Sequence, residues 1–106
     1  MASVKTTQYA LRQLRKEGWY PVVVEHWNSF SRHREDFLGI IDLICFRGEE
    51  VLGLQVTSRG NISSRVRKMA ESETIRYPRE AGWLIQVWGV DKGSNGRYRH
   101  KVVDVS

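Results

Sequence analysis

The sequence of 106 residues contains one cysteine, so no disulfide can form within the chain. Cys45 lies inside the apolar segment 40–46, where nothing nearby would lower its pKa, and we expect a buried, unreactive thiol. The lack of disulfides is typical of a reducing compartment. No apolar stretch reaches the roughly 18 residues that a membrane span needs, and no signal-peptide core is visible. We therefore expect an intracellular, cytoplasmic protein without a membrane partner.

Several catalytic signatures are missing as well. The three histidines have neither i, i+4 partners nor cysteine neighbours, so a zinc site is not expected. The sequence has no glycine-rich phosphate loop and no serine–histidine–aspartate set. These absences argue against zinc enzymes, phosphate-loop nucleotide hydrolases and serine hydrolases. The four tryptophans are expected in the core, and Trp27 is the best exception because it adjoins a polar segment.

The overall composition is that of an ordered globular domain. Hydrophobic residues make up 41% and charged residues 27% of the chain, and we expect one domain over residues 1–106. Lys and Arg number 17 against 12 Asp and Glu, which gives a net charge of +5. This balance favours a polyanionic partner, of which nucleic acid is the commonest, although a merely basic protein is the alternative.

The apolar periodicity predicts a helix, three strands, a second helix and two strands. The first helix is expected over 5–17, with Gly18 just past its end. The second is expected to begin after Asn61 as N-cap, while residues 28–38 form a polar loop. Strands are expected at 20–27, 40–47, 50–57, 83–90 and 98–105. The apolar stripe of the second helix comprises Ile62, Val66, Met69 and Ala70.

The position of the second helix determines the expected architecture. A helix between the third and fourth strands allows a parallel crossover, whereas the Gly48-Glu49 pair is typical of a tight turn between antiparallel strands. We therefore predict an α/β fold with a mixed central sheet of about five strands flanked by helices.

Asp42 is the most informative residue, because it is an acid inside an otherwise apolar strand. A buried carboxylate needs a cation, a metal or several hydrogen-bond donors. If Gly48 and Glu49 form the turn, Asp42 lies opposite Gln55, and Thr57 shares that face, which Gly53 leaves open. Carboxylate, amide and hydroxyl oxygens suit Mg²⁺. An ion pair between Asp42 and an arginine is the alternative.

The ordered set of elements and residues resembles the PD-(D/E)XK nuclease superfamily, above all archaeal Holliday-junction resolvases and RecB-type nuclease domains. The resemblance covers nearly the whole chain. It implies a restriction-endonuclease-like fold and a DNA endonuclease that uses Mg²⁺ or Mn²⁺ and acts on branched DNA such as Holliday junctions. Similarity to small phage and prophage proteins is carried by Glu25-His26-Trp27-Asn28, Arg34-Glu35-Asp36-Phe37-Leu38-Gly39-Ile40-Ile41-Asp42-Leu43 and Gln55-Val56-Thr57-Ser58.

The resemblance assigns roles to residues of this chain. Asp42 matches the metal-binding aspartate, Gln55 matches the (D/E) position, and the backbone carbonyl of Val56 matches a further metal ligand. Thr57 falls where the superfamily has its catalytic lysine, which is a clear departure. Related resolvases carry a further glutamate in the first helix, which this chain lacks. Glu25 is the expected replacement, both as metal ligand and as catalytic residue, and Asp36 is the runner-up; a surface salt bridge is the alternative for each.

A threonine hydroxyl cannot supply the positive charge of the missing lysine. Arg59, Arg65 and Lys68 follow the third strand and are candidates for a relocated cation, with Lys68 and Arg65 preferred. We expect them to support metal-assisted phosphodiester hydrolysis and largely sequence-independent binding to the DNA backbone. The residues expected to bind DNA are Arg34, Arg59, Arg65, Arg67 and Lys68.

Two functions stay open at this point. The first is an active DNA endonuclease, which implies a homodimer if both strands are cut, because each small subunit would carry one active site. The second is a non-cleaving nucleic-acid-binding module on the same fold, which the threonine at position 57 favours. The resemblance to phage and prophage proteins also allows a phage-encoded protein that acts inside a host cell.

Overall fold

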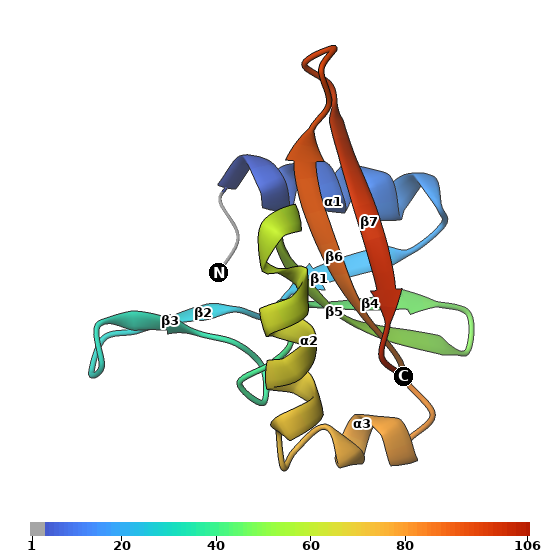
Figure 1. Cartoon of the computed structure of the whole chain (residues 1–106). Helices are drawn as coiled ribbons and strands as arrows, with labels where there is room; N and C mark the ends of the chain where they lie inside the picture. The colour runs from blue at the N-terminus through green and yellow to red at the C-terminus, as the bar shows by residue number, and fades with distance from the viewer. Residues whose placement is uncertain (1–3) are drawn as a thin grey trace.

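The computed structural model describes residues 4–106 (Figure 1). Its helices are α1 (Val4–Lys16), the 3₁₀ turn η1 (Arg59–Asn61), α2 (Ile62–Glu71) and α3 (Arg76–Glu80). Its strands are β1 (Tyr20–Val23), β2 (His26–Asn28), β3 (His33–Glu35), β4 (Leu43–Arg47), β5 (Glu50–Ser58), β6 (Leu84–Lys92) and β7 (Tyr98–Asp104). None of these helices is both long and apolar enough to cross a membrane.

Five strands form a mixed central sheet in the order β1-β4-β5-β6-β7. Strands β5 and β6 run parallel, and every other neighbouring pair in this sheet is antiparallel. The parallel pair is possible because α2 and α3 carry the chain across the sheet between these two strands. The predicted α/β class, with a mixed sheet flanked by helices, is confirmed.

Alternating side chains of the strands bury two hydrophobic layers, one on each face of the sheet. One layer packs against α1, whose residues Ala10, Leu11 and Leu14 are all buried. The other packs against α2, through Met69, and against the segment that leads into α3. The α1 layer includes Leu43, Cys45, Leu52, Leu54, Val56 and Trp88, and the α2 layer includes Ile40, Ile41, Ile44, Ile85 and Val87.

The hairpin between β4 and β5 has the predicted register, with Ile44 opposite Gly53. Gly48 opens its turn with φ +58°, a value that glycine adopts at little cost. The regular pairing ends at Leu43 and Leu54, one residue short of Asp42. The Asp42 N–H instead donates to the Leu54 carbonyl at 2.9 Å, so Asp42 begins the hairpin without pairing directly with Gln55.

The prediction for residues 20–38 was wrong in two respects. The expected strand over 20–27 divides into β1 and β2, and the expected loop over 28–38 contains β3, which pairs with β2 in a separate two-stranded hairpin. The side chain of Asn28 forms the turn of this hairpin, because its Oδ1 accepts the N–H of Phe30 at 2.9 Å. Local side-chain hydrogen bonds therefore hold this polar stretch in a hairpin.

Three smaller expectations also differ from the structure. The face beside Gly53 is not open, because a Cβ there would lie 2.8 Å from Cδ1 of Ile41. Ala70 is exposed, although it was placed in the apolar stripe of the second helix. Asn61 is the N-cap of α2 as predicted, but its side chain makes no capping bond and instead donates to Ser58 Oγ at 2.8 Å.

Candidate metal centre

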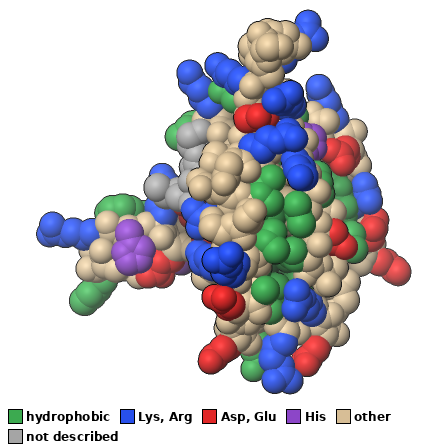
Figure 2. Space-filling model, viewed as in Figure 1, with side chains coloured by type: hydrophobic (Ala, Val, Ile, Leu, Met, Phe, Trp, Pro, Cys, Tyr) green, Lys and Arg blue, Asp and Glu red, His purple; other side chains and the backbone are tan. Residues whose placement is uncertain are grey.

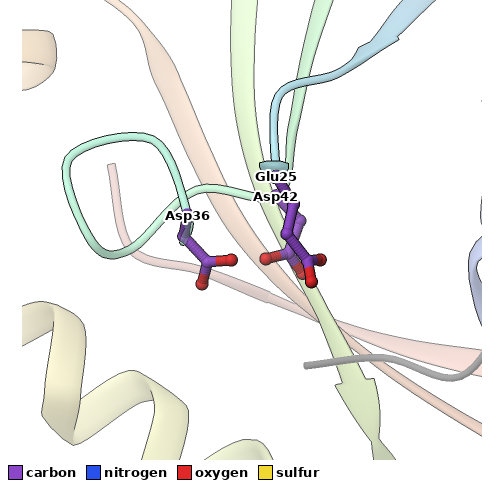
Figure 3. A group of neighbouring side chains, drawn as sticks. All are labelled: Glu25, Asp36 and Asp42. Atoms are coloured by element: carbon purple, nitrogen blue, oxygen red, sulfur yellow. The ribbon is translucent and has the colours of Figure 1, made fainter. Parts of the chain in front are cut away.

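Three carboxylates from separate parts of the chain converge at one edge of the sheet. One oxygen from each of Glu25, Asp36 and Asp42 lies within 4.8 Å of the others (Figure 3). Glu25 precedes β2 and Asp36 follows β3, so the β2–β3 hairpin brings their backbones together, and Asp42 directly precedes β4. The fold thus brings together Asp42, the predicted main ligand, Glu25, the predicted replacement for the missing glutamate, and Asp36, the runner-up. These three residues are called the acidic cluster.

Asp42 is the buried member of this acidic cluster, with 4% of its surface exposed. Burial raises its pKa to about 7, and a hydrogen bond to and repulsion from the Asp36 carboxyl act in the same direction. The Val56 N–H donates to Asp42 Oδ2 at 2.9 Å and acts in the opposite direction. The charged form of Asp42 is therefore costly near neutral pH, and a nearby cation would offset this cost.

Gln55 is fully buried beside these carboxylates. Its Nε2 donates to Asp36 Oδ2 at 2.8 Å and lies 3.4 Å from Asp42 Oδ1. The side chains of Asp42 and Gln55 therefore lie next to each other as predicted, although the amide nitrogen of Gln55, rather than its oxygen, faces the acids. Within the described residues, Gln55 Oε1 has no hydrogen-bond partner.

A second buried oxygen also lacks a hydrogen-bond partner among residues 4–106, namely Oε1 of Glu25. The Arg34 Nε lies 3.9 Å from it, at the limit of an ion pair. Buried polar atoms without partners are rare, and a bound ion or water molecule would satisfy them. The three carboxylates, one of which carries the unpartnered Glu25 oxygen, form a set of hard donors that fits a divalent cation such as Mg²⁺ or Mn²⁺.

Positions 56 and 57 contribute differently from each other. The side chain of Val56 belongs to the α1 layer of the core, while its N–H orients Asp42. Thr57 is buried with 1% of its surface exposed, and its backbone lies opposite Gly89 of β6. A buried hydroxyl at this position brings no positive charge to the acidic cluster.

Positive charge reaches the acidic cluster from α2 and from the β2–β3 hairpin instead. A cavity of about 410 Å³ is lined by Glu25 and Asp36 together with three cations. Arg65 is the most enclosed of these, because its Nε is buried and, within the described part of the chain, has no hydrogen-bond partner. The three cations that line the cavity are Arg34, Arg65 and Lys68.

The other two expected DNA-binding residues lie elsewhere. Arg67 and Lys68 line a neighbouring cavity of about 420 Å³ on the same side of α2. Arg59 points toward β6, where its Nη1 lies 3.8 Å from Asp91 Oδ1. The structure therefore brings Arg65 and Lys68, the two preferred candidates, to the acids, and it directs Arg59 to a different partner.

Comparison with known proteins supports the fold. No protein-family model and no curated protein sequence matches the chain. Among solved structures, the chain is similar to Hjc of Archaeoglobus fulgidus, a Holliday junction resolvase from an archaeal hyperthermophile, with 15% sequence identity and a TM-score of 0.58. The match covers 97% of this chain and 88% of that one. The chain therefore shares the fold of this resolvase, as the resemblance to the PD-(D/E)XK superfamily predicted.

Proposed function

We propose that this protein is a metal-dependent endonuclease that hydrolyses phosphodiester bonds in DNA. The observation that carries the proposal is the convergence of Glu25, Asp36 and Asp42 beside a cavity lined with cations. Nuclease chemistry requires this combination, because a phosphodiester is an anion that must be held next to a water-activating centre. The resolvase-like fold supports the same reading.

The residues of the acidic cluster have distinct proposed roles. Asp42 would be the main metal ligand, held in orientation by the Val56 N–H, with Glu25 and Asp36 completing the carboxylate set. Gln55 would contribute its amide oxygen after turning the amide group, and the Val56 carbonyl is a further proposed ligand. When bound, a divalent ion such as Mg²⁺ would polarise a phosphoryl oxygen and lower the pKa of a water molecule.

The charge that the missing lysine would supply is assigned to α2. Arg65 and Lys68 line the same cavity as Glu25 and Asp36, so they can hold a phosphate next to the carboxylates. Arg34 and Arg67 would extend this contact along the backbone, while Arg59 would bind DNA only by leaving Asp91. Thr57 would support the site through packing.

The substrate and the assembly belong to the same proposal. Similarity to a Holliday junction resolvase favours branched DNA over linear duplexes. Cutting two strands symmetrically requires two active sites, so we propose a homodimer. Such a substrate would place the protein inside a cell, and the resemblance to phage and prophage proteins favours a phage-encoded origin.

A non-cleaving DNA-binding module is the second candidate, and the buried Thr57 in place of the lysine favours it. Such a module would use the same fold and the same cation-lined cavity, but it would not hydrolyse DNA.

The test is a cleavage assay on a four-way junction and on a linear duplex, each with Mg²⁺, Mn²⁺ or EDTA. We expect metal-dependent cleavage by the wild type and a loss of about a hundredfold or more in Asp42→Asn, because the ion loses its main ligand. Glu49→Gln, which neutralises an exposed acid in the β4–β5 turn, serves as the control and should cleave normally. Cleavage that persists in Asp42→Asn contradicts the proposed centre, and junction binding without cleavage by the wild type supports the second candidate.

A further inference from the structure

The β2–β3 hairpin, residues 26–35, forms a sheet of its own and projects from the body of the molecule as an arm (Figure 1). An isolated two-stranded ribbon is marginally stable in water. Local hydrogen bonds hold this one: Asn28 Nδ2 donates to Glu35 Oε1 at 2.8 Å, and the Arg32 N–H donates to the Asn28 carbonyl at 2.8 Å. The chain thus maintains a projecting element that adds little to the core.

The arm presents two exposed aromatic side chains. Phe30 at its turn is fully exposed, with a relative accessibility of 101%, and Trp27 on β2 is 59% exposed. The Asn28 Oδ1 accepts the N–H groups of Phe30 and Ser31, which fixes the turn and holds Phe30 outward. Figure 2 shows hydrophobic, basic, acidic and histidine side chains together on the arm. An exposed phenylalanine and an exposed tryptophan each lack the favourable free energy that burial in a core would give.

The face of the arm that carries Trp27 and Arg34 extends to the acidic cluster. Trp27 pairs directly with Arg34 across the hairpin, so their side chains share one face. The Arg34 Nε in turn lies 3.9 Å from Glu25 Oε1. Glu25 and Asp36 are also the residues that flank the arm in sequence, one before β2 and one after β3. A ligand bound along this face would therefore be held next to the carboxylates.

The chemistry of the arm selects the ligand. Aromatic rings stack on bases, and arginines beside them attract the phosphate backbone. Bases inside a continuous duplex are already stacked on each other, so Phe30 and Trp27 could reach only bases that are unpaired. The arm of a second copy of the chain is a poorer ligand for this arm, because Arg32 and Arg34 of the two arms would repel each other.

We propose that the arm binds DNA with unpaired bases next to a duplex by stacking Phe30 and Trp27 on those bases. The inference rests on the proposed function for the class of ligand, but binding through the arm requires neither a metal nor cleavage. It narrows the proposed branched substrate to DNA that has unpaired bases close to the bond that is cut.

The test measures fluorescence anisotropy in EDTA with a forked oligonucleotide, a duplex that ends in two single-stranded tails, and with the same duplex fully paired. We expect Phe30→Ala and Trp27→Ala each to weaken fork binding about tenfold or more. Binding to the paired duplex should change by less than roughly threefold, because only unpaired bases offer a free face. Tyr20→Ala, which removes an exposed aromatic from β1 of the main sheet, is the matched control and should change neither.

A direct readout comes from 2-aminopurine placed at the first unpaired position of the fork. Its fluorescence should fall when the wild type binds, fall equally with Phe30→Tyr, and fall much less with Phe30→Ala. Equal weakening on both DNAs, or no weakening, would overturn the proposal, as would a dimer that dissociates in Phe30→Ala while fork binding is unchanged. Arm-dependent fork binding by a protein that cleaves no DNA in the separate assay with Mg²⁺ or Mn²⁺ would refute the proposed endonuclease and leave the arm inference standing.

Discussion

At the scale of single residues, Asp42 carries the electrostatic cost of the candidate centre. Its carboxyl is buried beside Asp36 and within reach of Glu25, so it is more easily protonated than an ordinary aspartate. The protein retains this arrangement although an asparagine of the same shape would avoid the cost. Such a cost is typical of functional sites, where stability gives way to the charge that the chemistry requires.

This cost makes the stability of the metal-free protein depend on pH. The pKa of Asp42 is about 7 in the folded chain and about 3.9 in an unfolded one, so the folded state holds an extra proton between these values. The contribution of Asp42 to stability is therefore complete below about pH 4 and is lost as pH rises through 7. Denaturant unfolding in EDTA should show Asp42→Asn gaining on the wild type between pH 4 and pH 8, by at most a few kcal/mol.

Mg²⁺ or Mn²⁺ at pH 8 should then recover more stability in the wild type than in Asp42→Asn, because the variant keeps Glu25 and Asp36 but lacks the buried third carboxylate. A difference between the two proteins that stays constant with pH, or equal stabilisation of both by the ion, would be inconsistent with this account.

Arg65 and Lys68 are expected to replace the lysine that Thr57 displaces. Arg65→Ala should lower kcat for DNA cleavage by about a hundredfold, since one stabilising charge near the phosphate is lost, and Arg65→Lys should recover part of it. Lys68→Ala should act in the same direction. Arg76→Ala on α3, where the arginine pairs with Glu80, is the control. Unchanged kcat in both Arg65→Ala and Lys68→Ala would show that the cation comes from elsewhere.

The main site residues were predictable from sequence to different degrees. The proximity of the Asp42 and Gln55 side chains followed from local hairpin geometry, because a tight turn determines which residues share a face, although the expected direct pairing of these two residues did not form. The joining of Glu25 and Asp36 was not predictable in this way. Their proximity depends on the path of the chain, which leaves the main sheet after β1 and returns to it after the β2–β3 hairpin. Asp36 was therefore ranked only as a runner-up.

At the scale of elements, the site depends on how closely α2 approaches the sheet. Gly89 of β6 makes this approach possible: a Cβ there would lie 2.3 Å from Cδ1 of Ile62 and 2.9 Å from the Cα of Arg59. Because α2 carries Arg65 and Lys68, its distance from the sheet also determines how these cations face the carboxylates.

Gly89→Ala should therefore destabilise the protein by about 1–3 kcal/mol through overpacking, and it should lower cleavage as α2 shifts. Gly60→Ala is the matched control, since a Cβ there meets nothing within 4 Å, and its effect on stability should be small. Chemical denaturation of the three proteins checks this expectation. A Gly89→Ala variant as stable as the wild type would mean that α2 is less tightly seated than the structure indicates.

Helices and main-sheet strands were predictable because their apolar periodicity is long and regular. The arm was not, since three-residue strands of polar residues carry no such signal and their order comes from the Asn28 side chain. Its exposed Trp27 was nevertheless identified in the sequence as the best exception to a core position, because it adjoins a polar segment.

At the scale of the whole molecule, the net charge of +5 favours association with DNA before any specific contact forms. The affinity for duplex DNA should fall steeply as salt concentration rises, because bound cations release counterions from the phosphates. In filter-binding or anisotropy titrations, Arg67→Ala should reduce the slope of log K against log[salt] by about one, while Arg76→Ala leaves it unchanged. An unaltered slope for Arg67→Ala would remove this residue from the DNA contact.

The central claim is that one fold gathers Glu25, Asp36 and Asp42 around a divalent cation. The most direct measurement is an anomalous difference map from crystals of the whole chain grown with Mn²⁺. We expect a single strong peak bounded by these three carboxylates in crystals of the wild type and no such peak in crystals of Asp42→Asn. A map without a peak between them, with Asp42 still sharing a proton with Asp36 in the presence of the ion, would contradict it.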